Sequence, residues 1–223
     1  MTTTTRIPMT TEGAGLLLTQ WLSPAFPLGG FAWSQGLEEA VAEGSVTGAA
    51  SLARWFDTTL HHGAGRSDTL LLAAAWRAET PEEVHDIADL ARALAPSAER
   101  RAETLQQGAA FARLGREVWD LDLPDMALPV AVGRAARLAG QPLPPTATLY
   151  LQSLFATLAQ AAQRLLPLGQ TEAQRLLAEV TGAIPAHVGP LLTQDLSALG
   201  AFTPALDAAS MRHETREPRI FRS

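Results

Sequence analysis

The chain is short, apolar and mildly acidic. It has 223 residues, of which 47% are hydrophobic and 18% charged, enough for the core of one domain and unlike a disordered protein. The net charge of −6 argues against general affinity for nucleic acid or anionic membranes. Lysine and cysteine do not occur. This excludes P-loop and Schiff-base lysines, thiolate zinc sites and disulfides.

The first residues, 1–11, are rich in threonine and lack the apolar block of a secretory signal. We expect them to form a frayed leader. The longest apolar runs, such as Leu70–Trp76, are far shorter than the roughly 20 residues that cross a membrane. We therefore expect a cytoplasmic protein that does not bind a membrane.

Apolar residues recur every three or four positions along most of the chain, which is the spacing of one helix face. In chain order, the clearest stretches are Glu82–Leu94, Ser97–Asp120, Ala147–Leu166 and Val188–Leu199. The sequence therefore predicts an all-α fold, a single globular bundle of roughly nine or ten helices.

Residues typical of helix ends agree with this periodicity. Thr80–Glu83 has the pattern of a capping box, with a proline in the first turn, and Thr171–Gln174 repeats the box. Gly44, Gly140 and Gly182 stand where helices should end.

Two stretches depart from the helical pattern. Residues 23–36 form a loop rich in proline and glycine that carries three aromatic side chains. After Thr203 the periodicity stops, and residues 210–223 carry four arginines and two glutamates. We therefore predict a helical core over 12–203 and a flexible C-terminal tail over 204–223. Three alternatives are open for the tail: it is solvated, it folds back on the acidic body, or it docks on another protein. Within the core, Gly108 and Gly115 would weaken an isolated helix, so we expect another backbone to approach them closely.

The residues do not assemble a recognisable catalytic or metal-binding motif. His61 and His62 are the best metal candidates, but adjacent helical residues point about 100° apart. His85 and Asp89 have helical i,i+4 spacing, which is most simply an exposed polar pair. We predict no catalytic residues, no metal ligands and no tightly held cofactor.

Three segments, in the same order along the chain, resemble the UreF family of urease accessory proteins. Residues 23–38 (SPAFPLGGFAWSQGLE) are similar to the N-terminal signature of that family. Residues 166–175 (LPLGQTEAQR) resemble its central block, and 211–215 (MRHET) with 219–223 (RIFRS) resemble its end. Weaker similarity lies at Glu103–Gly108 and at Pro129–Gly133.

The resemblance implies an all-α scaffold without chemistry of its own. Members of the family are expected to form homodimers and to bind the accessory protein UreD, also called UreH. They are expected to recruit or gate the GTPase UreG, so that the complex inserts nickel into apo-urease. Nickel would be handled by the complex rather than held tightly by this chain.

The resemblance also implies which residues contact partners. They are Arg212, His213, Glu214, Thr215, Arg219, Phe221 and Arg222 in the tail, and Pro167, Gly169, Gln170, Thr171 and Arg175 in the central block. The sequence departs from the family pattern at 216–218, where Arg-Glu-Pro replaces the usual Gln-Tyr-Ser, and at Trp33, where tyrosine is usual.

Two other functions remain open from the sequence. One is a nickel-binding chaperone that uses His61, His62, His85 or His213. The other is a GTPase-activating factor that supplies an arginine to UreG in trans, since arginine suits phosphate charge. Arg100, Arg101, Arg134 and Arg137 are the clustered arginines, which are otherwise explained as surface residues in solvated ion pairs.

Overall fold

The computed structural model describes residues 11–223, and this part of the chain is helical throughout, without a strand. It contains ten α-helices and two short 3-10 helices (η). In chain order they are α1 (Thr11–Trp21), η1 (Gly30–Ala32), α2 (Leu37–Ala42), α3 (Ala49–His62), α4 (Ala64–Arg77), α5 (Pro81–Ala93), α6 (Ala98–Trp119), α7 (Leu128–Leu138), α8 (Leu143–Leu165), α9 (Gln170–Leu191), η2 (Leu196–Ala198) and α10 (Pro204–His213). The predicted all-α bundle is confirmed. The predicted leader, apart from Thr11, lies outside the described residues.

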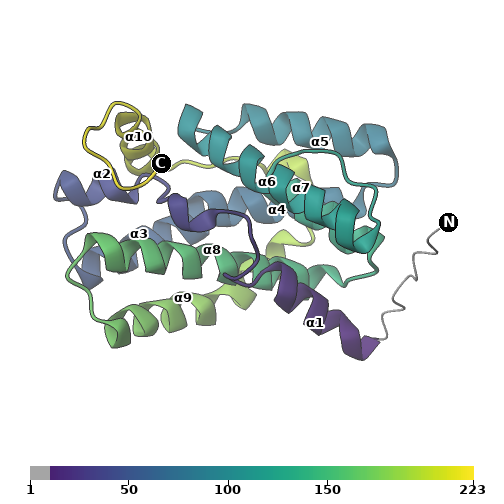
Figure 1. Ribbon diagram of the computed structural model, residues 1–223, viewed down its shortest axis with the longest axis horizontal. Coiled ribbons are helices and arrows are strands. Elements are labelled where there is room, and N and C mark those ends of the chain that lie inside the picture. Colours follow the sequence, from purple (N-terminus) through teal and green to yellow (C-terminus); the bar gives the residue numbers. More distant parts are fainter. Residues whose placement is uncertain (1–10) are drawn as a thin grey trace.

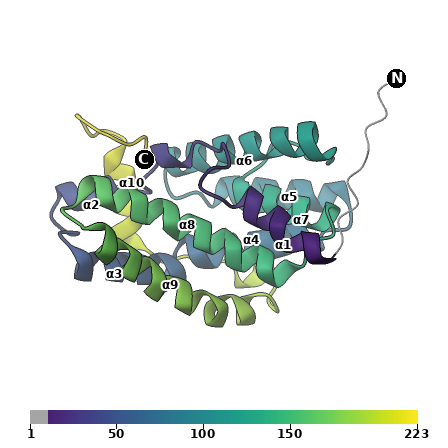
Figure 2. The ribbon, with the colours of Figure 1, turned by 60° about the horizontal axis from the view of Figure 1, so that its bottom comes forward.

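The helices form a bundle around α4, which packs against α7 and α8. Helices α5, α6 and α7 lie on one side of it, and the α8–α9 pair lies on the other (Figure 1). Turning the molecule shows α8 alongside α9 again, with α1 lying beside the N-terminal end of α8 (Figure 2). Between residues 11 and 223, no helix has the length and apolar character needed to cross a membrane.

The 23–36 loop packs against the core through two of its three aromatic residues, Phe26 and Trp33, whereas Phe31 is exposed. The ring of Phe26 lies 5.7 Å from that of Phe111 on α6, and the Trp21 ring meets Phe111 edge to face at 5.5 Å. Such pairs add to the stability that burial of the rings provides. Trp33, later in the loop, is also buried. The loop is therefore held in place by packing.

Most of the predicted helix ends are confirmed. The Thr80 hydroxyl accepts from the backbone N–H of Glu83, while the Glu83 carboxylate accepts from the backbone N–H of Thr80. Gly44 and Gly140 follow helices with positive φ values of 77° and 66°.

Two predicted helix ends are wrong, both on α9. Thr171 lies inside its first turn, because Gly169 is the residue that precedes the helix. Gly182 lies within α9, which continues because the apolar residues beyond it, such as Ile184 and Val188, are buried against the core. The free energy gained by burying this apolar face outweighs the low helix propensity of a single glycine.

Gly108 on α6 allows the close backbone approach that the sequence predicts. A Cβ atom at this position would lie 1.9 Å from the carbonyl oxygen of Met126 and 2.7 Å from the backbone nitrogen of Leu128. The polypeptide that leads into α7 therefore passes directly over α6 at this glycine. At Gly115 the same expectation is wrong, because the atom nearest to an added Cβ is a side-chain carbon, Leu123 Cδ1, at 2.6 Å.

The C-terminal region folds back onto the bundle, so the expectation of a flexible tail is corrected. Pro204–His213 forms α10, which packs against α2 and α6. Beyond it, Phe221 and Ser223 are only 2% and 0% exposed. Helical periodicity did not indicate this, because α10 is short and the residues after it are held by individual polar contacts rather than by a repeating apolar face.

Candidate functional site

Three parts of the chain that are distant in sequence meet at one end of the molecule. They are the turn before α2, the start of α6, and residues 214–223, which we call the C-terminal segment. The backbone N–H of Ser34 donates to the carbonyl oxygen of Ser223 at 3.0 Å, and the N–H of Arg222 donates to that of Ala32 at 2.8 Å. Figure 1 shows the C-terminus beside α10 and α2.

Glu38 is the central acceptor of this site. Its side chain is buried, and its two carboxylate oxygens accept from the backbone N–H groups of Ile220 at 2.7 Å and Phe221 at 2.8 Å. His213 Nε2 lies 3.0 Å from the same carboxylate. Burial alone would raise the pKa of Glu38, but the hydrogen bonds from His213, Ile220 and Phe221 lower it below its usual range. Glu38 is therefore ionised and holds the segment against α2.

His213 joins α10 to two other helices. The ring is fully buried, with Nδ1 2.7 Å from Glu99 Oε2 on α6 and Nε2 3.0 Å from Glu38 Oε2 on α2. Arg219 donates to the other oxygen of Glu99 at 2.6 Å. Helix α10 and the C-terminal segment are thus linked through the same two carboxylates.

The arginines of this region pair with acidic residues of the bundle. Arg212 donates to Glu43 at 2.7 Å, and Arg216 donates to Glu39 at 3.0 Å. Arg222 instead lies over the ring of Trp33, its guanidinium carbon 4.6 Å from the centroid. With the Arg219–Glu99 pair, these contacts explain how a basic tail docks on an acidic body.

A tight turn at Gln35 and Gly36 receives α10 and the last residue. Both residues have positive φ, 58° and 80°. A Cβ at Gly36 would lie 2.8 Å from the backbone nitrogen of Ser210, so only glycine fits this close approach to α10. The Ser223 hydroxyl accepts from the backbone N–H of Gln35 and donates to Glu103, both at 3.2 Å.

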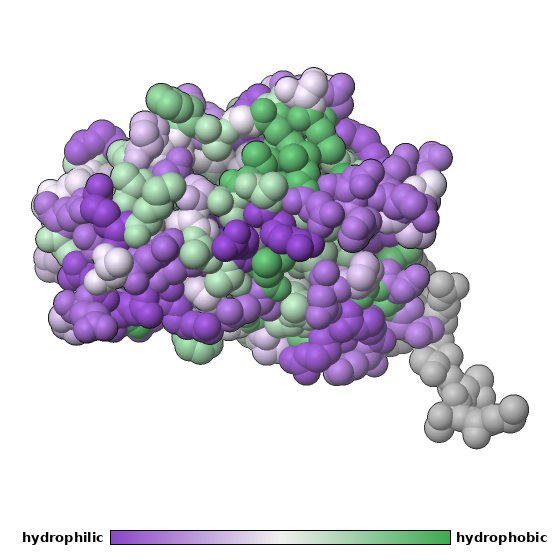
Figure 3. All heavy atoms as spheres, turned by 90° about the horizontal axis from the view of Figure 1, so that it is seen from above, coloured by the Kyte–Doolittle hydropathy of each residue, from purple (hydrophilic) through white to green (hydrophobic). Residues whose placement is uncertain are grey.

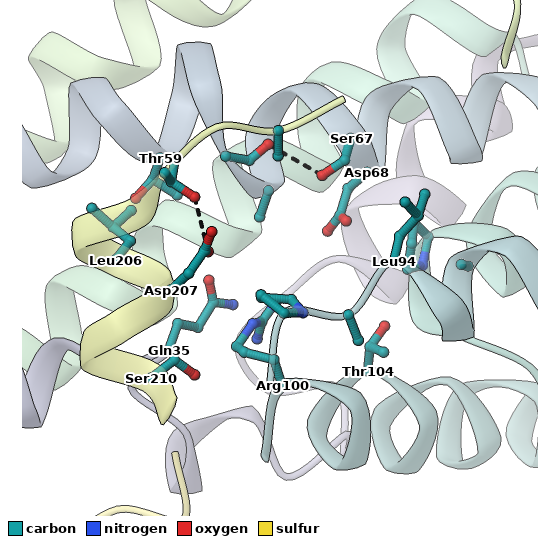
Figure 4. Close-up of a pocket in the computed structure, with 18 of the residues that line it drawn as sticks. Gln35, Thr59, Ser67, Asp68, Leu94, Arg100, Thr104, Leu206, Asp207 and Ser210 are labelled. Carbon is teal, nitrogen blue, oxygen red and sulfur yellow. Dashed lines mark hydrogen bonds between the residues drawn. The ribbon is translucent and has the colours of Figure 1, made fainter. Parts of the chain in front are cut away.

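Two cavities lie behind this turn, with volumes of about 190 and 240 Å³. Four residues line both of them: Gln35, Asp68, Arg100 and Thr104. Figure 4 shows the smaller cavity, with Asp68 and Arg100 entering it from opposite walls. Residues of α10, including Asp207 and Ser210, close one side, so docking of α10 completes the cavity.

Asp68 is the most perturbed carboxyl group in these walls. Burial raises its pKa to about 6, although a hydrogen bond from the Tyr150 hydroxyl at 2.7 Å and the nearby Arg100 oppose the rise. Arg100 itself pairs with Glu103. Asp68, Arg100 and their partners thus present polar and charged groups to the cavities. No nucleophile among them is paired with a base.

The histidines do not assemble a metal centre in the described structure. His61 lies next to His187, with ring centroids 5.1 Å apart, whereas His85 is exposed beside Asp89 on α5. Both ring nitrogens of His213 are already engaged by carboxylates. Over residues 11–223, no three histidine, aspartate or glutamate side chains converge as metal ligands would.

The structure brings the predicted partner-binding residues to the same end of the molecule. Arg164, in the last turn of α8, lies over the ring of Phe221, with its guanidinium carbon 4.2 Å from the centroid. The turn that follows α8 therefore adjoins the C-terminal segment. The predicted contact residues of this turn and of the first two turns of α9 are exposed: Pro167, Gly169, Gln170, Thr171 and Arg175.

Within α10 and the C-terminal segment, the predicted contacts divide into two groups. His213 and Phe221 are buried against the protein's own core, so in this arrangement they hold the segment rather than offer a side chain to a partner. The exposed residues are Arg212, Glu214, Thr215, Arg219 and Arg222.

Sequence reasoning missed the acidic residues that receive the segment. Glu38 and Glu103 both fall within motifs that carry the family resemblance, which was the available signal. Glu99 had no such signal. Sequence reasoning also missed that three large apolar side chains are exposed. They are Phe31 in η1, Met211 on α10 and Ile220 in the C-terminal segment, which are 73%, 52% and 61% exposed. Figure 3 shows the face over α5, α6 and α10 as largely hydrophilic, with one large hydrophobic patch and several smaller ones.

Comparison with known proteins decides the family. A family model described as UreF matches residues 46–181, which is more than half of the chain. The chain belongs to the UreF family.

Several relatives named urease accessory protein UreF align over nearly the whole UreF-family chain. One from Cereibacter sphaeroides (strain KD131 / KCTC 12085) is 50% identical over 212 residues, covering 95% of this chain and 100% of the relative. One from Roseobacter denitrificans is 46% identical over 220 residues, covering 99% and 98%. One from Ruegeria pomeroyi is 43% identical over 213 residues, covering 96% and 98%. The resemblance drawn from the motifs is confirmed, and the shared name supports a role in urease maturation.

Proposed function

We propose that this chain is a non-enzymatic scaffold of urease maturation. It binds UreD (UreH) and recruits or gates the GTPase UreG, and the assembled complex inserts nickel into apo-urease. It acts as a homodimer, and nickel is cargo of the complex. The observation that carries the proposal is the docked C-terminal segment. It is hydrogen-bonded to the N-terminal family-like segment and contacts Arg164, which precedes the central one.

The residues exposed on this surface suit a protein partner. Phe31, Met211 and Ile220 present large apolar side chains. Arg219 precedes Ile220 in the sequence, and the backbone N–H of Arg222 donates to Ala32, the residue after Phe31. Interfaces typically combine apolar or aromatic anchors with arginine. Because Arg219 and Arg222 are also held in place by Glu99 and Trp33, the surface is ordered before a partner arrives.

Capture of purified UreD by the full-length chain tests this surface. Ile220→Ser removes an exposed apolar side chain from the C-terminal segment, and we expect capture to weaken at least about tenfold. Val118→Ser is the matched control, since Val118 is 57% exposed and lies near the opposite end of α6, about 30 Å from Ala98. If the unaltered chain does not capture UreD, the proposal fails. If both variants capture it normally, a different surface is used.

Two further measurements separate the scaffold from the alternatives. Stoichiometric nickel binding by the isolated chain, lost on His61→Ala, would favour a nickel-binding chaperone. Faster GTP hydrolysis by UreG on addition of this chain, abolished by Arg101→Ala, would favour an activating arginine. Arg101 is the exposed residue of the Arg100–Arg101 pair, whereas Arg100 is held by Glu103.

A further inference from the structure

The larger of the two cavities, about 240 Å³, is covered by the first part of the 23–36 loop. Residues 22–31 line it in one unbroken stretch. Phe31 and Gln160 also belong to its lining and are exposed, so the cavity opens to solvent beside them. The loop therefore does more than pack Phe26 and Trp33 against the core, because it also encloses a volume large enough for a small molecule.

The walls of this cavity combine apolar side chains with three charged ones. The charged residues are Asp68, Arg100 and Glu103. Sites for small molecules are commonly built in this way, from apolar walls and a few polar groups that fix the orientation of the ligand. The apolar lining residues include Leu22, Phe26, Leu28, Leu128 and Leu154.

Two of the three charged side chains have hydrogen-bonding groups to spare. Glu103 is engaged at both oxygens, since it accepts from two glutamine amides and from Arg100. Arg100 uses only Nη1 in that contact, and Asp68 uses only Oδ2, which accepts from the Tyr150 hydroxyl at 2.7 Å. Between residues 11 and 223, Asp68 Oδ1 and the other guanidinium N–H groups of Arg100 have no partner. These atoms are what the cavity offers to a ligand.

Asp68 and Arg100 lie on opposite walls. Figure 4 shows both side chains entering the smaller cavity, and both also line the larger one. Asp68, with a pKa of about 6, is ionised at neutral pH, and arginine is always charged. A purely cationic ligand would leave Arg100 without an acceptor, and a purely anionic one would leave Asp68 without a donor. Unsatisfied groups cost free energy in a buried site, so the walls favour a ligand that carries a charge of each sign.

The volume of the cavity limits the size of such a ligand. An apolar cavity of about 150 Å³ holds benzene, a six-carbon ring. On the same scale, a cavity of about 240 Å³ admits roughly ten non-hydrogen atoms. Leucine and valine are within this limit, whereas tryptophan exceeds it.

We propose that the larger cavity binds a small apolar amino acid, or another zwitterion of the same chemistry. The ammonium group of the ligand donates to Asp68 Oδ1, its carboxylate accepts from Arg100, and its alkyl side chain packs against residues 22–31. The first part of the 23–36 loop thus forms the apolar wall of a ligand site. This inference goes beyond the proposed scaffold function and is tested without UreD, so either can fail alone.

Calorimetric titration of the isolated full-length chain with L-leucine at about pH 7.5 tests the site. Two matched probes are 3-methylbutylamine, which is leucine without its carboxylate, and 4-methylpentanoate, which is leucine without its ammonium group. We expect leucine to bind at one site, at least about tenfold more tightly than either probe, because each probe leaves one charged wall unpaired. The proposal is overturned if leucine shows no saturable binding up to about 20 mM. Equal affinity for leucine and either probe would also overturn it.

Asp68→Asn removes the acceptor charge without changing the size of the side chain. We expect it to weaken leucine binding at least about tenfold. Asp86→Asn makes the same change at an exposed position on α5 and should bind leucine as the unaltered chain does. Unchanged affinity in Asp68→Asn would contradict the assigned role of this carboxylate.

A second variant tests the cavity without altering its charged groups. Ser153 lies on α8 and lines the larger cavity. Ser153→Leu places a bulkier side chain in the space of the ligand, so leucine binding should fall at least about tenfold. Urea unfolding of both variants confirms that they are folded. If folded Ser153→Leu binds leucine as tightly as the unaltered chain, the ligand does not occupy this cavity.

Discussion

The guanidinium carbon of Arg222 lies 4.6 Å from the centroid of the Trp33 ring. Trp33 is buried and belongs to the N-terminal motif, whereas Arg222 is the penultimate residue. The backbone next to each is also joined, since the N–H of Arg222 donates to Ala32. The two most separated family-like segments therefore form one unit.

This contact predicts the effect of removing the arginine. Arg222→Ala should weaken docking of the C-terminal segment by about 0.5–2 kcal/mol, the usual range for a cation–π pair. Exchange of the amides at 220–222 would report the loss. Arg113→Ala, at an exposed position on α6, should leave the exchange rates unchanged. Equal rates in both variants would show that the ring contact contributes nothing.

The buried ring of Phe221 should matter more than the last hydroxyl. Phe221→Ala removes an aromatic side chain that is 2% exposed, and such truncations cost about 3–5 kcal/mol. Ser223→Ala loses hydrogen bonds to Gln35 and Glu103, worth about 1–3 kcal/mol. We expect UreD capture to fall further for Phe221→Ala, in line with the segment's docking. The reverse order would argue that packing of the ring is not what holds the segment.

Asp68 should make stability fall with rising pH. Its pKa of about 6 in the folded protein exceeds the usual 3.8, so the folded state holds this proton more tightly and loses that advantage between about pH 4 and 6. Above pH 6 the penalty reaches up to about 3 kcal/mol. Asp68→Asn should therefore gain stability relative to the unaltered chain as the pH rises from 4 to 7.5, measured by urea unfolding. An unchanged difference across this range would contradict the assigned pKa.

Two glycines in helices should respond oppositely to alanine. Gly108→Ala places a methyl group 1.9 Å from Met126 O and should destabilise the fold by at least about 1–3 kcal/mol. Gly182→Ala, on α9, meets no atom within 4 Å and should stabilise it by up to about 1 kcal/mol. Midpoints of urea unfolding compare the pair. Similar shifts for both would show that the close approach at α6 is not required.

Testing the C-terminal segment by substitution is preferable to deleting it. Removal of residues 211–223 would take away His213 and the backbone donors that satisfy Glu38. It would also expose the apolar surface of the bundle that Phe221 covers, since that side chain is 2% exposed. Loss of binding in a truncated chain could then reflect damage to the bundle as well as loss of the surface.

The amino-acid sequence by itself determined the fold class, the capping box at Thr80 and the family, because these depend on local spacing and motifs. It predicted that Gly108 admits another backbone but not which one. Only the tertiary structure decided that the C-terminal segment folds back and that Glu38 and Glu99 enclose His213. These contacts join residues more than a hundred positions apart through burial and charge pairing, which leave no periodic trace in the sequence.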